Sequence, residues 1–213
     1  MQEVLNAGTE TSAITTQWAM SELILNPHLI KQAQEELDAV VGVDRLVQDS
    51  DIPKLPYLQA IVKETFRLHP PAPFPVPRES TQPSQIMGYN LPAQTTLIFN
   101  LYAIHRDPDV YENPDMFNPD RFMKHPEVDH TAMYNYYQLM PFGAGRRMCP
   151  GYQLGDMLVH LMVANLLHSF DWGLPKGENV ESFDMSEVMS LVVSRKNPLY
   201  LVAKPRLSDA HLA

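Results

Sequence analysis

A helical spacing of apolar residues recurs four times along the chain. It predicts helices over residues 3–25, 27–42, 56–68 and 151–170. Asn26-Pro27 separates the first two helices, because proline is favoured at the first position of a helix and not in its interior. The six residues 7–12, Ala-Gly-Thr-Glu-Thr-Ser, are poor helix formers and are predicted to interrupt the first helix.

The remaining segments are predicted to be extended, looped or hairpin-like. Residues 70–77 contain five prolines, which favours an extended chain. Turn residues predict a hairpin from 86–90 and 95–100, a helical turn over 102–105 and a terminal hairpin over 191–204. Residues 107–140 lack a long periodic segment and are predicted to form an ordered loop. The expected fold class is mainly α with small β-sheets, without an internal domain boundary.

Composition narrows the possible functions. The 213 residues are 45% hydrophobic, which suffices for a large core, and the formal net charge of -9 argues against nucleic acid as the main partner. A single cysteine excludes an intrachain disulfide and any multi-cysteine metal site. There is neither a membrane-length apolar run nor a signal peptide. A helical pattern begins almost at Met1 without a cap, so we expect a fragment of a longer chain.

The single cysteine, Cys149, lies in a loop rich in glycine, arginine and proline that spans residues 141–151 and precedes the fourth predicted helix. We call residues 141–151 the cysteine loop. Its glycines allow the backbone to approach a flat, anionic group closely. From these residues alone the thiol could be inert, a nucleophile or a metal ligand.

Five positions of the cysteine loop match the pattern Phe-x-x-Gly-x-Arg-x-Cys-x-Gly, namely Phe142, Gly145, Arg147, Cys149 and Gly151. This pattern resembles the haem loop of cytochrome P450 monooxygenases. Three more motifs follow the order of that family: residues 7–12, 64–67 and 119–122. The sequence around these motifs is similar to that of the plant group of P450s that hydroxylates phenolics, flavonoids and terpenoids. The resemblance implies that residues 1–213 are the C-terminal, haem-binding part of a single P450 domain whose N-terminal part is absent.

By this resemblance, Cys149 is the axial thiolate ligand of the iron in haem b. A thiolate donates electron density to the iron and favours O–O bond cleavage. Phe142 is expected to cover the sulfur from water. Gly143, Gly145 and Gly151 are expected to let backbone donors and the following helix stabilise the negative sulfur. The alternative, a buried inert cysteine, does not explain the surrounding motif.

Two arginines match the positions from which the family binds the haem propionates. They are Arg147 and Arg78, and planar guanidinium groups are well suited to carboxylates. Arg146 is expected to be solvated and to contribute to a basic patch on which a negatively charged reductase docks. The alternative for all three is an ordinary surface arginine.

Glu64 and Arg67 are three residues apart and so share one helix face. The family pairs them with an arginine of the later loop, here Arg121. A buried glutamate with two arginine neighbours requires full hydrogen bonding, so this set is expected to lock the irregular loop under the haem. The alternative is a surface ion pair.

Glu10 and Thr11 are the expected catalytic residues. A threonine hydroxyl can donate to bound dioxygen and organise water, while the acid connects that water to solvent for two protonations. Ala7 and Gly8, one turn earlier, are expected to leave space beside the cofactor. The alternative is a threonine that only caps or bonds back within a kinked helix, which gives no reason for the acid.

The eight histidines show no spacing typical of metal ligands and are expected to have ordinary surface or core roles. His69 is expected to interact with the carbonyls at the end of its helix.

The function that the resemblance implies is a haem-thiolate monooxygenase. Electrons from NADPH arrive through NADPH-cytochrome P450 reductase, and one atom of dioxygen enters an apolar or phenolic small molecule. Residues 7–11, 72–76 and 189–192 are expected to border the substrate. Related proteins are held on the cytoplasmic face of the endoplasmic reticulum by an N-terminal anchor that this sequence lacks.

Two other classes of function are weighed against this one. The chain could be an inactive truncated fragment that cannot hold haem. It could also be a P450-fold isomerase or dehydratase, which rearranges peroxides without dioxygen or a reductase. Thr11 and Glu10 speak against that second possibility.

Overall fold

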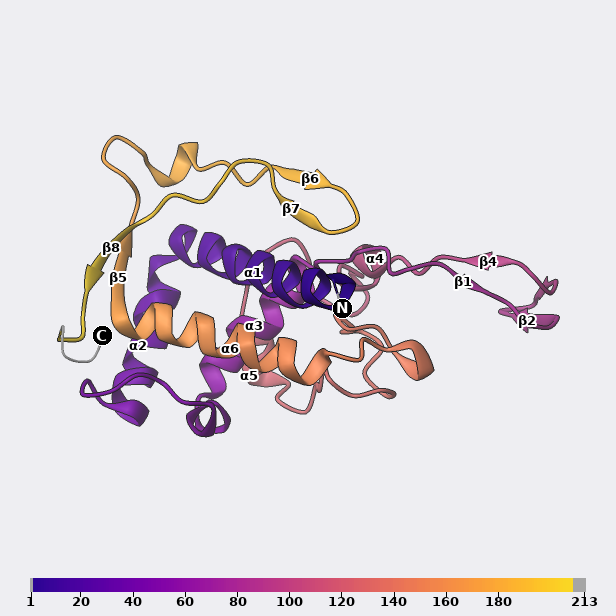
Figure 1. The fold of residues 1–213 in the computed structure, drawn as a ribbon, viewed down its shortest axis with the longest axis horizontal. Helices are drawn as coiled ribbons and strands as arrows, with labels where there is room; N and C mark the ends of the chain where they lie inside the picture. The colour runs from indigo at the N-terminus through magenta and orange to yellow at the C-terminus, as the bar shows by residue number, and fades with distance from the viewer. Residues whose placement is uncertain (1, 209–213) are drawn as a thin grey trace.

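The computed structural model describes residues 2–208, and helices make up the body of the molecule (Figure 1). The long helices are α1 (Gln2–Leu25), α2 (Pro27–Val41), α3 (Pro56–Leu68) and α6 (Tyr152–Ser169). Shorter ones are α4 (Leu101–Ile104), α5 (Asp120–Lys124) and the 3-10 helices η1 (Asp49–Lys54), η2 (Gly145–Arg147) and η3 (Val180–Ser182). The four long helices agree with the ranges predicted from apolar spacing.

Helix α1 is continuous, so the predicted interruption at residues 7–12 is wrong. The hydroxyls of Thr9, Thr11 and Ser12 each donate to the carbonyl four residues earlier. Because these side chains bond to their own helix rather than compete with it, the weak helix formers are accommodated.

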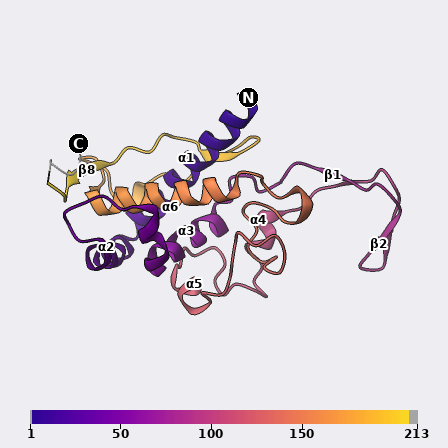
Figure 2. The same ribbon diagram turned by 60° about the horizontal axis from the view of Figure 1, so that its bottom comes forward.

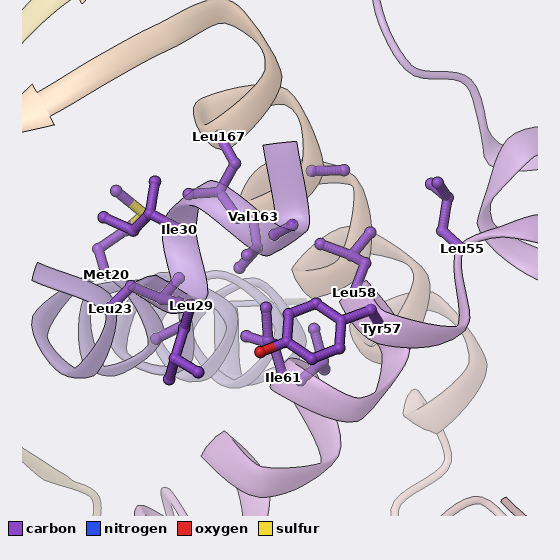
Figure 3. Close-up of a cluster of buried hydrophobic side chains, with 14 of the residues drawn as sticks. Met20, Leu23, Leu29, Ile30, Leu55, Tyr57, Leu58, Ile61, Val163 and Leu167 are labelled. Carbon is purple, nitrogen blue, oxygen red and sulfur yellow. The ribbon is translucent and has the colours of Figure 1, made fainter. Parts of the chain in front are cut away.

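The main hydrophobic core lies where the four long helices meet (Figure 3). Leu23 of α1, Leu37 of α2 and Leu58 of α3 are fully buried there, together with Val163 and Leu167 of α6. The core residues of α6 are Val159, Val163, Ala164 and Leu167, whose spacing places them on one face of the helix.

The start of α3 is capped from another helix. Leu55, its N-cap residue, offers no side-chain hydrogen bond, and Pro56 occupies the first helical position. The Glu36 carboxylate of α2 instead accepts the backbone N–H groups of Tyr57 (2.8 Å) and Leu58 (3.0 Å). This contact satisfies free donors of α3 and fixes its angle to α2.

The strands form four two-stranded antiparallel sheets within the described residues. The pairs are β1 (Arg78–Glu79) with β4 (Thr96–Leu97), β2 (Ser84–Ile86) with β3 (Tyr89–Leu91), β5 (Phe170–Gly173) with β8 (Val202–Pro205), and β6 (Glu187–Met189) with β7 (Val193–Arg195). The first two pairs project from the helical body as an arm (Figure 1).

Both predicted hairpins have different partners in the structure. Residues 84–91 close on themselves at Met87-Gly88, where both residues have positive φ, as a tight two-residue turn requires. Thr96–Leu97 pairs with Arg78–Glu79 instead. At the C-terminus, Val202–Pro205 pairs with the strand after α6, not across Asn197-Pro198.

Candidate functional site

The cysteine loop folds back on itself before α6. The backbone N–H of Cys149 donates to the carbonyl of Phe142 (2.9 Å), which closes the loop at its base. Gly143 and Gly145 have φ of 74° and 72°, a region that side chains with a Cβ avoid. The expected tight backbone is therefore present at these two glycines.

The side chain of Cys149 is exposed, and α6 begins three residues later at Tyr152. Gly151 is the N-cap residue of α6, with φ of -95°, so its conformation does not itself require glycine. The first N–H groups of a helix form its positive end. That end of α6 follows the segment that carries the sulfur.

Phe142 anchors the cysteine loop to the helices. Its ring lies edge-on to Phe66 of α3, with 5.3 Å between the centroids, and packs against the main core. A Cβ at Gly155 of α6 would come 3.6 Å from this ring, an ordinary contact distance, so Gly155 lies directly beside Phe142. Gly155 was not among the predicted site residues. Shielding of the sulfur by Phe142 stays a prediction.

The structure brings Arg78 and Arg147 together. Arg78, at the start of β1, donates from Nη2 to the carbonyl of Arg147 (3.2 Å) and from Nη1 to the carbonyl of Val76 (3.0 Å). Neither guanidinium forms an ion pair with a carboxylate of the described residues. Guanidinium groups without a carboxylate partner suit a ligand with carboxylate groups.

Ala7, Gly8 and Glu10 are exposed on the N-terminal half of α1. A Cβ at Gly8 would meet no atom within 4 Å, so there is open space beside this part of the helix. The Thr11 hydroxyl donates to the carbonyl of Ala7 (2.8 Å), which is the bond back within its own helix that the alternative role of Thr11 predicts. Its oxygen can still accept a hydrogen bond, and its part in proton delivery stays a prediction.

Helices α1 and α6 touch near their middles and diverge toward the N-terminus of α1 (Figure 2). Thr16 of α1 contacts the sulfur of Met162, 3.6 Å from its hydroxyl oxygen. Leu154 and Met157, on the early turns of α6, are exposed large apolar residues. Exposed apolar and small residues on two diverging helices suit a flat apolar ligand.

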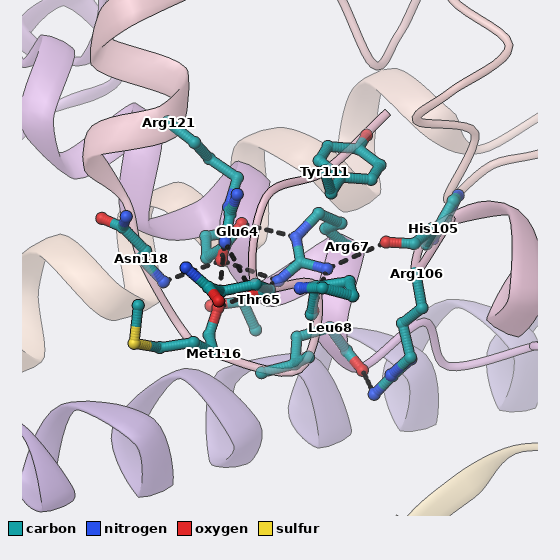
Figure 4. Close-up of polar contacts among 12 residues, drawn as sticks. Glu64, Thr65, Arg67, Leu68, His105, Arg106, Tyr111, Met116, Asn118 and Arg121 are labelled. Carbon is teal, nitrogen blue, oxygen red and sulfur yellow. Dashed lines mark hydrogen bonds and ion pairs between the residues drawn. The ribbon is translucent and has the colours of Figure 1, made fainter. Parts of the chain in front are cut away.

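Glu64, Arg67 and Arg121 form the expected buried network (Figure 4). The Glu64 carboxylate accepts from Arg67 Nε (2.7 Å) and Nη2 (2.8 Å), from Arg121 Nε (3.0 Å) and from the backbone N–H of Asn118 (2.8 Å). Glu64 and Arg67 are fully buried. The surface-pair alternative is thereby excluded, and the prediction of a buried set is confirmed.

The network extends to the cysteine loop through His105, which was not singled out in the sequence. Arg67 Nη1 donates to the His105 carbonyl (2.9 Å), and His105 Nε2 accepts the backbone N–H of Met140 (3.0 Å). Burial, together with the charge of Arg67, lowers the pKa of His105 from 6.5 to about 3. His105 is therefore a neutral acceptor that fixes the residue before the loop.

Residues next to two of the segments expected to border the substrate, 72–76 and 189–192, are hydrogen-bonded to each other. Val193, which begins β7, donates its N–H to the carbonyl of Pro71 (2.8 Å), and its carbonyl accepts from Trp18 Nε1 (3.4 Å). Met189 and Leu191, on the preceding turn, are exposed. These contacts join the β6–β7 hairpin to α1 and to the proline segment after α3.

The predicted role of His69 is wrong. Its ring stacks on Trp18, with centroids 4.2 Å apart and planes inclined by 2°, and its Nε2 lies 2.7 Å from the Glu22 carboxylate. The imidazole thus bonds to a side chain of α1 and not to the carbonyls of its own helix.

These residues fit a haem group. The exposed Cys149 could supply a ligand, the two arginines without carboxylate partners suit propionates, and the open side of Gly8 leaves room beside α1. No group of three or more His, Cys, Asp or Glu side chains suited to a metal ion occurs among residues 2–208. None of the helices described for this chain has the length and apolar character needed to cross a bilayer.

The family model named Cytochrome P450 matches residues 1–202. A flavonoid 3',5'-hydroxylase of Crocosmia x crocosmiiflora is 47% identical over 206 residues, which cover 96% of this chain and 39% of that protein. Cytochrome P450 76C1 of Arabidopsis thaliana is 48% identical over 200 residues, covering 94% of this chain and 38% of the relative. The chain thus spans about two fifths of the length of these curated relatives.

A solved structure of a zebrafish cytochrome P450 with abiraterone superimposes with a TM-score of 0.85 at 32% sequence identity. The match covers 96% of this chain and 47% of the zebrafish chain. The expected fold class, mainly helical with small sheets and corresponding to a C-terminal portion, is confirmed. The chain belongs to the cytochrome P450 family.

Proposed function

We propose that this protein acts as a haem-thiolate monooxygenase that inserts one atom of dioxygen into an apolar or phenolic small molecule. The observation that carries the proposal is the exposed Cys149 in a closed, glycine-dependent loop at the start of α6. The relatives named flavonoid hydroxylase and flavonoid 3'-monooxygenase support the reaction class. They also make an aromatic plant metabolite a reasonable substrate class.

When bound, haem supplies an iron centre that accepts electrons and activates dioxygen. The chain's part is to hold Cys149 where it can bind the haem iron. The bond between Cys149 N–H and the Phe142 carbonyl fixes the backbone of the cysteine at the base of the loop, directly before α6.

Arg78 and Arg147 bind the two haem propionates in this proposal. Each arginine offers N–H donors in a planar fork that matches a carboxylate. The bond from Arg78 to the Arg147 carbonyl brings the Arg78 guanidinium to the backbone of the cysteine loop.

Proton delivery is assigned to Thr11 and Glu10. The Thr11 oxygen accepts a hydrogen bond from an ordered water while its own O–H group still donates to the Ala7 carbonyl. The exposed Glu10 carboxylate exchanges protons with solvent. Ala7 and Gly8 leave the face of α1 open for the substrate and dioxygen.

Electrons come from NADPH through NADPH-cytochrome P450 reductase, which docks near the exposed Arg146. The full-length protein is placed at the cytoplasmic face of the endoplasmic reticulum membrane, as implied by its resemblance to the plant enzymes.

The test is a carbon monoxide difference spectrum of the reduced, haem-loaded protein. We expect a thiolate-type Soret band that disappears in Cys149→Ala. Adjacent arginines provide a matched pair, since Arg147→Ala should lower haem affinity about tenfold or more while Arg146→Ala should not. Reductase-supported, NADPH-dependent oxygen uptake then separates a monooxygenase from an isomerase. A spectrum without the thiolate band would overturn the proposal for this chain.

A further inference from the structure

We propose that Arg195, together with Trp18 and His69, clamps the β6–β7 hairpin onto α1 and thereby sets the space that a substrate has beside the haem. The tip of this hairpin, residues 189–192, is one of the segments expected to border the substrate. The three clamp residues lie outside that segment and act as positioning residues for it. The effect on the substrate space rests on the proposed function, whereas the attachment of the hairpin to α1 does not.

Arg195 of β7 connects the hairpin to α1 and to the chain before β6. Its Nη1 donates to the hydroxyl of Ser21 on α1 (3.0 Å), and its Nη2 donates to the backbone carbonyl of Asp184 (2.6 Å). The guanidinium carbon lies 4.9 Å from the centre of the Phe183 ring and 5.6 Å from that of Trp18. One partly buried guanidinium therefore bonds to two elements and lies over two aromatic rings.

Trp18 holds the part of the same strand that is nearer to the tip. Its indole N–H donates to the carbonyl of Val193 (3.4 Å), and the N–H of Val193 donates to the carbonyl of Pro71 (2.8 Å). Both Trp18 and Val193 are buried. The backbone of Val193 is therefore held from two sides, by α1 and by the segment after α3.

His69 supports Trp18 and lies between α1 and the hairpin. Its ring stacks on Trp18, and its Nε2 donates to the Glu22 carboxylate of α1, 2.7 Å away. Its Nδ1 is buried without a hydrogen-bond partner among the described residues and lies 3.6 Å from the carboxylate of Glu187 on β6. The imidazole therefore fills the space between a side chain of α1 and a side chain of the hairpin.

The clamp places the tip of the hairpin toward Thr11. Trp18 follows Thr11 by seven residues, nearly two turns, so both side chains leave the same face of α1 about 10 Å apart. Arg195 contacts Ser21. Val193, which is nearer to the tip, contacts Trp18, which is nearer to the start of α1. The hairpin thus lies along α1 with its turn toward the N-terminal half of the helix, as Figure 1 shows.

The test measures hydrogen exchange of the Val193 amide in the 213-residue chain. Arg195→Met keeps an unbranched apolar side chain but removes the donors to Ser21 and Asp184. Protection of the Val193 amide should therefore fall about tenfold or more. Arg195→Lys keeps a charge over the two rings and one donor group, and should restore about half of that loss on a logarithmic scale.

Arg206→Met is the matched control. Arg206, directly after β8, is also partly buried, and its guanidinium donates to the carbonyl of His168 (2.9 Å) and to the carboxylate of Asp38 (2.7 Å). In this variant, protection of the Val193 amide should stay within about twofold of the wild type. Wild-type protection in Arg195→Met, or an equal fall in Arg206→Met, would overturn the clamp.

A milder variant decides if Arg195→Met does not fold. Ser21→Ala removes only the hydroxyl that accepts from Arg195, and alanine suits the interior of a helix. The Val193 amide should then lose about threefold in protection. Unchanged protection in Ser21→Ala would refute the attachment through Arg195.

A second readout concerns the space beside the haem. Imidazole and phenylimidazole can both bind haem iron through a ring nitrogen, but only phenylimidazole adds an apolar ring that occupies the substrate space. In the haem-loaded protein, Arg195→Met should weaken phenylimidazole binding about fivefold or more and imidazole binding less than about twofold, measured from the shift of the Soret band. Arg206→Met should change neither affinity.

The two readouts separate the clamp from the proposed function. If the exchange result holds and Arg195→Met weakens both azoles equally or neither, the role of the clamp in the substrate space is wrong. If the exchange result holds and the wild type neither binds haem nor responds to either azole, the proposed function fails while the attachment of the hairpin to α1 stands.

Discussion

The buried His105 gives the most direct test of how the cysteine loop is held. Its ring is fully buried, Nε2 accepts the N–H of Met140, and its carbonyl accepts from Arg67. Replacement by glutamine keeps a carbonyl acceptor near the position of Nε2 but removes the titration. His105→Gln is therefore expected to change the pH dependence of stability more than stability at neutral pH.

The sign follows from the two protonation states. The pKa of His105 falls from 6.5 to about 3 on folding, so the unfolded chain binds the proton more strongly. The contribution of neutral His105 to the free energy of unfolding is complete above about pH 6.5 and is lost as the pH falls from there toward about 3. At pH 5 the proton is almost fully bound in the unfolded chain and almost absent in the folded one. The loss relative to pH 8 is then about 2 kcal/mol.

The assay is urea unfolding of the 213-residue chain at a series of pH values. The wild type should lose about 2 kcal/mol more than His105→Gln between about pH 8 and pH 5. His125→Gln, an exposed replacement of the same kind, should follow the wild type. A His105→Gln variant with the wild-type acid slope would refute the assignment of His105 as a neutral acceptor.

Three further predictions follow from the site. Arg67→Met leaves the Glu64 carboxylate buried beside Arg121 alone and should lower the free energy of unfolding by about 3–5 kcal/mol. Unfolding followed by circular dichroism measures this loss, and a loss below about 1 kcal/mol would contradict the buried network. Gly145→Ala forces a Cβ into a left-handed backbone and should cost about 1–2 kcal/mol, measured as a lowered Tm, whereas Ala at Gly151 should cost less; equal costs would argue against the strain. Thr11→Ala should leave haem bound and uncouple NADPH consumption from product; full coupled turnover would remove Thr11 from proton delivery.

The long helices were predictable because their apolar residues already repeat at the helical period. Proline at the first position of α2 and α3 marks each start without any knowledge of the fold. Helix α1 shows that the low helix propensity of residues 7–12 does not by itself interrupt a helix. Its hydroxyl residues bond to carbonyls of their own helix, and the helix continues into a part that packs against α6, so the weak stretch extends a helix stabilised elsewhere.

Strand pairing was less predictable because the paired segments are only two to four residues long. Residues 202–205 pair with 170–173, across more than twenty residues of intervening chain, so turn chemistry near Asn197-Pro198 carries no information about them. The hairpin at Met87-Gly88 is the exception, since a local turn does determine its register.

For the site, motif spacing located the loop, its glycines and the Glu64 network, but not the residues that connect them. His105 has no distinctive sequence context, and it acts through a contact with Met140, 35 residues along the chain. Gly155 lies beside the Phe142 ring only because the fold brings the two together. Such roles arise from packing and are visible only in three dimensions.

The supports of the cysteine loop reach it from different elements. Arg67 acts through His105 on Met140, before the loop, and Arg78 donates to the carbonyl of Arg147 inside it. Within the loop, the N–H groups of Met148 and Cys149 donate to the carbonyls of Gly145 and Phe142. The remote hydrogen bonds add to these internal ones, so a change at a remote residue should alter the environment of Cys149 without touching the motif.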